Sequence, residues 1–325
     1  LLAVTQPRLT LTALAVVPLA AERFWELNRN KALVAAFFAV PTALYLVFGL
    51  GAHGAQELGH KGLEYASFMT LLGSLFVISG GIVVRGSLAG TPIVNTGLLG
   101  LGALLASWIG TTGASVLLIR PLLRANAERK HKVHVVVFFI FVVSNCGGLL
   151  TPLGDPPLFL GFLKGVPFGW TLGLWPEWLF VNCALLVVFN VWDQIALNRE
   201  QAKTTEPLLE ELIEHEPLRI DGLHNVAFLA GIIAVIYASG SGLGSNGAPW
   251  LTGIQEAAML AIAIAAFLTT PAHLRAANRF RFGPIIEVAV LFAGIFVTMA
   301  PALLLLNQNA ASLPVREPWQ FFWAS

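Results

Sequence analysis

Four oxygen-bearing side chains lie close together in an otherwise apolar stretch between positions 133 and 163. Ser144, Asn145 and Thr151 supply hydroxyl and amide oxygens, and Asp155 supplies a carboxylate. Hard cations such as sodium prefer ligands of this kind. A carboxylate within an apolar stretch is costly, and this makes it a candidate for ion binding or proton exchange. The run predicts a cation site.

Glycines and prolines interleave with these oxygen ligands. Glycine permits backbone conformations that are closed to other residues, whereas proline removes an amide donor and clashes with a continuing helix. The segment 133–163 is therefore expected to be a helix broken near its middle, with unwound carbonyls that can bind a cation. The residues concerned are Gly147, Gly148, Gly154, Pro152, Pro156 and Pro157.

Asp155 also has a simpler explanation. An Asp followed by a proline at the first helical position is a normal helix start, so the carboxylate could cap a half-helix that begins at Pro156. Capping and ion binding are compatible, and the sequence leaves both open.

Composition places this chain in a lipid bilayer. Of its 325 residues, 56% are hydrophobic and 11% are charged, and the mean hydropathy is +0.75. Soluble domains carry about 25% charged residues. The net charge of +1 indicates no nucleic-acid partner, and Cys146 and Cys183 suggest neither a disulfide framework nor a metal site. No hydrolase motif or phosphate-binding loop is present, so an enzyme is not expected.

Apolar segments of about 20 residues predict a polytopic all-α protein. A shorter apolar segment covers 9–21, and polar residues at 53–64 predict a loop. The full spans are expected at 32–50, 65–84, 177–195, 224–239, 250–270 and 284–306.

Residues 92–123 are too long for one span and too short for two. Their centre, Ser107 to Ser115, is small and polar, and its middle part, Gly110 to Ser115, includes Thr111 and Thr112 and is the expected tip. We interpret the segment as a re-entrant helical hairpin whose tip lies inside the protein. The two threonines either join the cation site or satisfy the backbone of the hairpin.

Charge supports the hairpin. If 92–123 enters and leaves on one side, all but four of the 19 lysines and arginines fall on the cytoplasmic side, as the positive-inside rule expects. The exceptions are Arg8, Lys61, Lys164 and Arg316. A single crossing at 92–123 would destroy this bias.

The order of segments predicts an inverted repeat. Residues 1–195 form a first membrane half, the charged segment 196–223 is a cytoplasmic linker, and 224–325 begin a second half. The chain starts at Leu1 and stops at Ser325, and we expect it to be a fragment. Glu256 and Glu287, near span ends, and His131 and His134, beside a basic cluster, are expected at the interface.

The break from Ser144 to Pro157, preceded by the hairpin tip Gly110-Thr111-Thr112-Gly113, resembles the ion transporter superfamily. That group includes NhaD-type sodium/proton antiporters, CitMHS-like citrate transporters, arsenite permeases and divalent-anion/sodium symporters. The Gly-Asp-Pro-Pro ending is more similar to the antiporter branch, since the dicarboxylate symporters carry Thr where Asp155 stands. Of the symporters' Ser-Asn-Thr hairpin signature, only Thr112 agrees.

The resemblance implies an elevator-type secondary transporter of the bacterial inner membrane, usually a homodimer, whose hairpin tip and break together form a sodium site. Sodium/proton antiport is the first expectation, with Asp155 exchanging a proton for a cation. The alternative is sodium- or proton-coupled uptake of citrate or another carboxylate. No cofactor is expected besides the transported sodium ion and proton, and the partners are the lipid bilayer and a small ion or anion.

Overall fold

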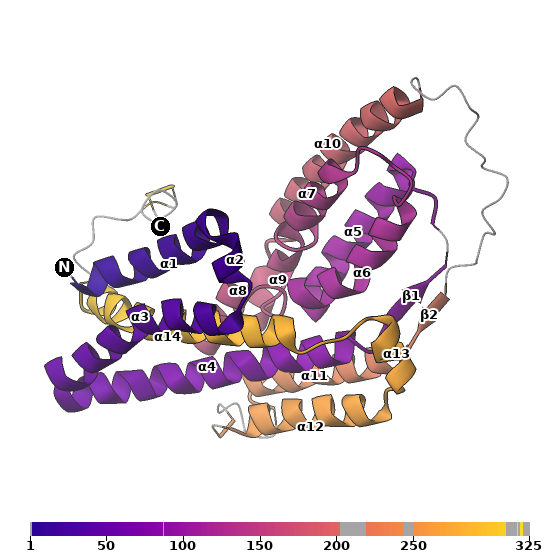
Figure 1. The fold of residues 1–325 in the computed structure, drawn as a ribbon. Helices are drawn as coiled ribbons and strands as arrows, with labels where there is room; N and C mark the ends of the chain where they lie inside the picture. Colours follow the sequence, from indigo (N-terminus) through magenta and orange to yellow (C-terminus); the bar gives the residue numbers. More distant parts are fainter. Residues whose placement is uncertain are drawn as a thin grey trace. The chain divides into compact units, whose positions relative to one another are not determined.

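The structure is a computed structural model that describes residues 2–86, 88–201, 219–243, 250–251, 253–309, 317 and 319–320 (Figure 1). It is predominantly helical. The chain divides into two compact units, one made of Leu1–Ala66 with Phe282–Ser325 and the other of Ser67–Arg281.

Within the described residues, seven helical segments are long and apolar enough to cross a membrane, which confirms a multi-pass membrane protein. Shorter apolar helices cover Pro7–Ala20 and Ile254–Thr269. The seven segments are Asn28–Gly49, Gly51–Ser79, Pro92–Ile109, Val133–Leu150, Trp175–Glu200, His224–Ser241 and Gly283–Leu305.

The first unit contains α1 (Leu2–Ala20), α2 (Glu22–Trp25), α3 (Asn28–Leu44), the first part of α4 (Gly51–Ser79), and α14 (Gly283–Asn309). A π-helical turn at Tyr45–Gly49 extends α3. Helix α14 packs along α3 and α1. The approach to α3 is close, because a Cβ at Gly294 would lie 3.0 Å from the Cβ of Ala35.

Helix α4 corrects the sequence prediction of a loop at 53–64. The helix begins at Gly51, has 29 residues and ends at Ser79. The polar residues here fit a helix because charged partners fall one turn apart: buried Lys61 donates to Glu64 at 2.8 Å. The predicted span 65–84 also ends earlier than expected, and Val83–Arg85 form strand β1.

The second unit contains a helical hairpin, α5 (Pro92–Ile109) and α6 (Thr111–Ala125), packed side by side (Figure 1). The expected interruption within 133–163 is present. Helix α7 (Val133–Val142) ends, a 3-10 turn η2 (Cys146–Leu150) follows, and α8 (Pro156–Leu163) resumes. The short helix α9 (Phe168–Leu172) leads to α10 (Trp175–Gln201), which packs on α5 and α7.

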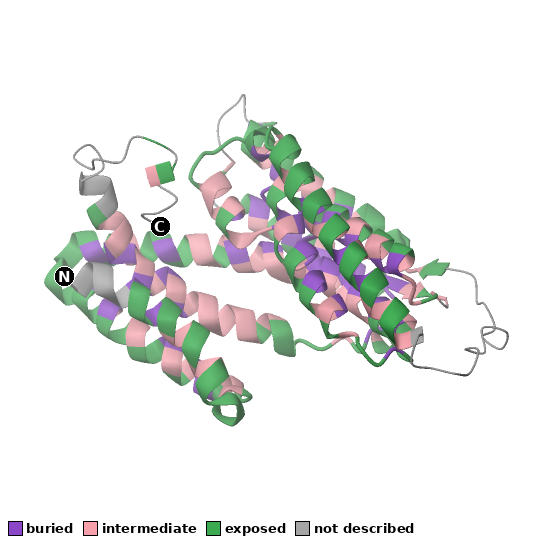
Figure 2. Ribbon diagram, turned by 90° about the horizontal axis from the view of Figure 1, so that it is seen from above, coloured by how far each residue is buried: buried purple, intermediate pink, exposed green. Residues whose placement is uncertain are grey.

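Burial follows this packing (Figure 2). Leu99 and Ala103 on α5, Leu118 on α6 and Val142 on α7 are at most 1% exposed and form the core of this group of helices. On α10, by contrast, Phe180, Val187 and Trp192 are more than half exposed. Such faces suit lipid, where apolar side chains need no protein cover.

The rest of the second unit is held by two short strands and polar side chains. Strand β1 pairs antiparallel with β2 (Arg219–Asp221), and α11 (His224–Ser241) packs on α12 (Ile254–Thr269). After α13 (Ala272–Ala277), the amide of Asn278 donates to the carbonyls of Gly80 and Ile82.

The linker expected at 196–223 is only partly described. Helix α10 continues into it as far as Gln201, and the strand β2 lies near its other end. Residues 202–218 lie outside the described part of the chain. The inverted repeat, the re-entrant course of the hairpin and the elevator mechanism stay predictions, as does the division into two membrane halves.

Candidate functional site

The hairpin tip contacts the helix break. Gly110 joins α5 to α6 with φ of +79°, a conformation that favours glycine. The amide of the next residue, Thr111, donates to the carbonyl of Gly154 at 3.0 Å. This bond satisfies one of the otherwise unpaired amides of the first turn of α6. The two segments predicted to form the cation site are therefore brought together.

Side-chain hydroxyls bind the break to the first arm of the hairpin. Ser107 on α5 donates to the carbonyl of Gly147 at 2.5 Å, and Thr151 donates to the carbonyl of Ser107. From α10, the indole nitrogen of Trp178 also donates to the carbonyl of Gly147, at 3.1 Å. Unwound backbone inside a membrane protein needs such partners, because lipid offers none.

The break also folds back on itself at two glycines. A Cβ at Gly148 would lie 2.5 Å from the Cγ2 of Thr111 and 2.9 Å from the carbonyl oxygen of Gly154. A Cβ at Gly154 would collide with the carbonyl oxygen of Gly148. Only glycine fits at either position, so the sequence pattern has a steric cause that the sequence alone could not show.

A hydroxyl pair lies farther along the same contact. The Oγ atoms of Ser115 on α6 and Ser144 at the end of α7 are 2.8 Å apart. Both serines line a cavity of about 280 Å³ between the two helices, whose other lining residues are Val116, Ile119, Val136, Phe139 and Ile140. The pair is half-buried, so it offers oxygens that are partly shielded from solvent.

Asp155 stands at the start of α8 in an extended conformation, with φ of −137° and ψ of 137°. Its side chain makes no capping hydrogen bond to the helix. Pro157 contributes to this, because it removes the amide at the second helical position, one of the two donors that a cap uses, while the amide of Leu158 at the third position donates to the backbone carbonyl of Asp155. Within the described residues no hydrogen bond or ion pair occupies this half-buried carboxylate. The side chain of Asp155 therefore does not cap α8.

The other predicted site residues differ in burial and in hydrogen bonding. Thr151 is fully buried, and its hydroxyl also accepts from the amide of Leu153 at 3.2 Å. Thr112 is half-buried and Asn145 is exposed, and neither side chain has a hydrogen bond among the described residues. The geometry brings Ser144, Gly147, Gly148, Thr151, Gly154 and Thr111 together, and their role as ion ligands stays a prediction.

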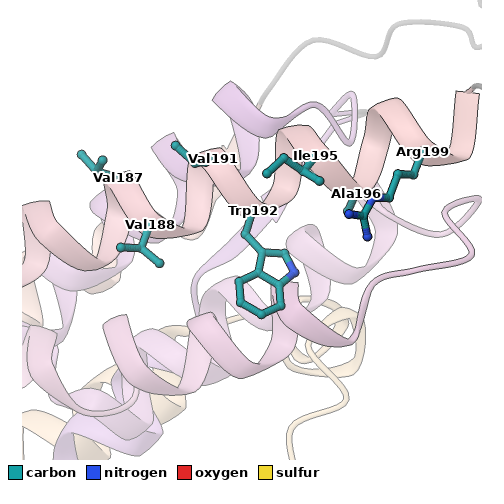
Figure 3. A pocket seen from close by; sticks show the side chains of 7 residues that line it. All are labelled: Val187, Val188, Val191, Trp192, Ile195, Ala196 and Arg199. Carbon is teal, nitrogen blue, oxygen red and sulfur yellow. The ribbon is translucent and has the colours of Figure 1, made fainter.

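A larger groove, of about 490 Å³, lies along α10 and contains none of the predicted site residues (Figure 3). Its lining comes from one helix, with Val187, Val191 and Ile195 along it and Arg199 at its end. An open apolar surface on a membrane-spanning helix is expected to face lipid. We therefore take the break, and not this groove, as the candidate functional site.

Two residues that hold the break were not predicted as part of the site, and one buried carboxylate elsewhere was missed. Ser107 and Trp178 fix the carbonyl of Gly147. Ser107 lies in the small, polar centre of 92–123, whereas no local pattern distinguishes Trp178 from other aromatic residues in apolar helices. Asp193 was missed although a signal existed, since it is a carboxylate inside the predicted span 177–195. It is fully buried and bonded to Arg129 and His134. His134 is therefore part of a buried cluster, although its neighbours suggested an interfacial position.

The two other carboxylates noted in the sequence have structural partners. Glu287 on α14 pairs with buried Lys31 on α3, with Oε1 and Nζ 2.6 Å apart. Glu256 at the start of α12 accepts a hydrogen bond from Ser67 on α4. Neither contact involves the break.

Comparison with known proteins decides the family. Residues 3–325 match the CitMHS_2 family, described as "Putative citrate transport". The chain belongs to this family. The match covers nearly the whole chain, which agrees with the resemblance carried by the break and the hairpin tip. CitMHS_2 is a transport family and not an enzyme family. No match was found among the curated proteins or the solved structures.

Proposed function

We propose that the protein is a secondary active transporter in which the break and the hairpin tip bind a coupling cation and Asp155 is its carboxylate. The observation that supports this most directly is the half-buried Asp155 carboxylate, which no hydrogen bond or ion pair occupies within the described residues. A carboxylate in an apolar helical region is expected to bind a cation or a proton. The positive end of the α8 dipole lies beside it and attracts its negative charge.

Sodium/proton antiport is the function that this geometry supports best. One carboxylate can hold a proton or a sodium ion, but not both at full occupancy, so the two ions exchange. The hairpin and the break also offer oxygens of the kind that sodium prefers, in the half-buried Ser144 and Ser115 pair and in the unwound backbone of the break. We also assign Thr112 and Asn145 as candidate ligands, because their side-chain oxygens make no hydrogen bond among the described residues.

Citrate transport is the second candidate, and the family description favours it. A carboxylate substrate would need amide donors or cations. The start of α6 offers the amides of Thr112 and Gly113, in the first turn where helices leave donors unpaired. In this case Asp155 would bind the coupling ion while the hairpin tip binds the anion.

Proteoliposomes carrying the full chain and a lumenal pH dye separate these functions. Sodium added outside should raise the lumenal pH if sodium entry drives proton exit, and lithium tests cation selectivity. A pH change that requires citrate would instead assign the protein to anion transport.

Asp155→Asn tests the residue itself. It should abolish the sodium-driven signal, whereas Glu128→Gln, which removes an exposed carboxylate from a loop of the same unit, should leave it intact. Unchanged sodium-driven proton flux in Asp155→Asn would contradict the proposed role.

A further inference from the structure

Three arginines come together where the end of α6 meets the turn after α13. Arg120 and Arg124 lie one turn apart in the last part of α6, and Arg279 follows α13. Nη1 of Arg120 donates to the carbonyl of Ala277 at 3.5 Å. Nη2 of Arg124 donates to the carbonyl of Val84 on β1 at 3.0 Å. These two bonds place the end of α6 against β1 and the end of α13.

The charges of these arginines are not matched by nearby carboxylates. Arg120 is repelled by both of the other guanidinium groups. Within the described residues none of the three makes an ion pair, and the carboxylate on the paired strand, Asp221, is bound by Arg85 and Arg219 at 2.8 and 2.9 Å. Like charges that lie close together are unfavourable, so an anion placed between the three arginines would be attracted to all of them.

Arg279 has a backbone conformation that arginine rarely adopts. Its φ is +44°, and it is the one described residue other than glycine with a positive φ. Its amide donates to the carbonyl of Ala276, and the amide of Phe280 donates to the carbonyl of Arg275, both at 2.8 Å. This pair of bonds forms the helix ending in which glycine usually occupies the left-handed position. Glycine would fit here with less strain, so we attribute the presence of arginine to a use of its side chain.

The arginines lie where the chain leaves the apolar helices. Helix α13 follows the apolar helix α12 in the chain and precedes the span that begins at Gly283. Basic residues in such connections are near the lipid headgroups, whose phosphate groups carry negative charge. A guanidinium group binds phosphate oxygens through two parallel hydrogen bonds. Arg120 is half-buried, whereas Arg124 and Arg279 are exposed, so the group of arginines is open to an anion from the surface.

We propose that Arg120, Arg124 and Arg279 form an anion site that binds a phosphate group, as carried by the headgroup of an anionic phospholipid. The bound phosphate holds the end of α6, the second arm of the hairpin, to the turn after α13. Free phosphate from the aqueous side has the same binding chemistry. Arg120 is about 14 Å along α6 from the hairpin tip, and the anion site does not rest on the transport function proposed above.

Thermal unfolding of the full chain in a neutral detergent tests the site, because a ligand that binds only the folded protein raises the unfolding temperature. Phosphatidylglycerol should raise this temperature more than the zwitterionic phosphatidylcholine does. A rise that inorganic phosphate alone produces would assign the site to the free anion, whereas a rise that requires phosphatidylglycerol would assign it to a lipid headgroup. The absence of a rise with either anion would overturn the proposal.

Two variants separate anion binding from folding, with the affinity taken from the dependence of the unfolding temperature on anion concentration. Arg120→Gln should weaken binding of the anion by about tenfold or more, because a charged hydrogen-bond donor is lost. Arg279→Gly should weaken it similarly, yet raise the unfolding temperature of the protein without anion, because glycine relieves the strained conformation.

Arg281→Gln is the matched control, because it removes an exposed arginine from the same loop. In neutral detergent no charged lipid surface attracts arginines in general, so this variant should bind the anion nearly as well as the natural protein does. An affinity that is unchanged in both Arg120→Gln and Arg279→Gly, or one that falls equally in Arg281→Gln, would overturn the proposal.

Discussion

The hydroxyl of Ser107 donates to the carbonyl of Gly147 at 2.5 Å, and this bond joins the first arm of the hairpin to the unwound turn of the break. The carbonyl of Ser107 accepts in return from Thr151 on the other side of the turn. One residue of α5 thus contacts both ends of the 3-10 turn. Together with the bond from the amide of Thr111 to the carbonyl of Gly154, this residue holds the break against the hairpin.

Ser107→Ala should destabilise the protein by about 1–2 kcal/mol, because it removes one buried hydrogen bond while Trp178 still serves the carbonyl of Gly147. Thermal unfolding in detergent should show a fall of a few degrees. Thr269→Ala is the matched control, since the hydroxyl of Thr269 bonds only to its own helix. If both variants lower the unfolding temperature equally, the hydrogen bond between the hairpin and the break stabilises the protein no more than a hydrogen bond within one helix.

Gly154→Ala should cost at least about 2 kcal/mol, because the added methyl group meets the carbonyl oxygen of Gly148 and the backbone has no room to move. The expected result is a large fall in unfolding temperature together with loss of transport. Gly73→Ala on α4 has open space around the new methyl group and should raise stability by about 0.5–1 kcal/mol. If Gly154→Ala is tolerated, the backbone at Gly148 and the backbone at Gly154 lie farther apart than described.

Asp155→Asn should change stability by less than about 1 kcal/mol, even though we expect it to abolish transport. The carboxylate makes no capping bond that could be lost, and its attraction to the start of α8 is the only favourable contribution removed. Measurements on the same preparation should therefore show loss of transport with a nearly unchanged unfolding temperature. A large loss of stability would instead indicate that Asp155 has a structural function.

The ion pair between Lys31 and Glu287 should respond unequally to removal of its two partners. The Lys31 side chain is 6% exposed, whereas that of Glu287 is 38% exposed. Glu287→Gln leaves a buried ammonium group unpaired, while Lys31→Met leaves a carboxylate that can reach solvent. We expect Glu287→Gln to be the more destabilising variant by about 2 kcal/mol, as measured by unfolding in detergent. The reverse order would mean that Lys31 reaches water through the first unit.

The amino-acid sequence alone determined the class of the protein and the position of the break, and it predicted the chemistry of the candidate site. The length of the apolar segments indicates a membrane protein, because a span must cross the hydrocarbon core of the bilayer. The glycines and prolines indicate the break, because they change the conformation and hydrogen bonding of their own backbone. The same local logic failed at 53–64, where polar residues form part of α4, because helical spacing lets Lys61 and Glu64 pair.

Only the tertiary structure decided which residues meet. Ser107 and Thr151 are 44 residues apart and Asn95 and Asp193 are 98 apart, so their contacts depend on how the helices pack. Packing also determined that Thr151 binds backbone while the carboxylate of Asp155 stays unpaired among the described residues. The same holds for His134, which closely follows the basic residues Lys130 and Lys132 in the sequence. Its buried partner Asp193 comes from another helix, and no local pattern could supply that contact.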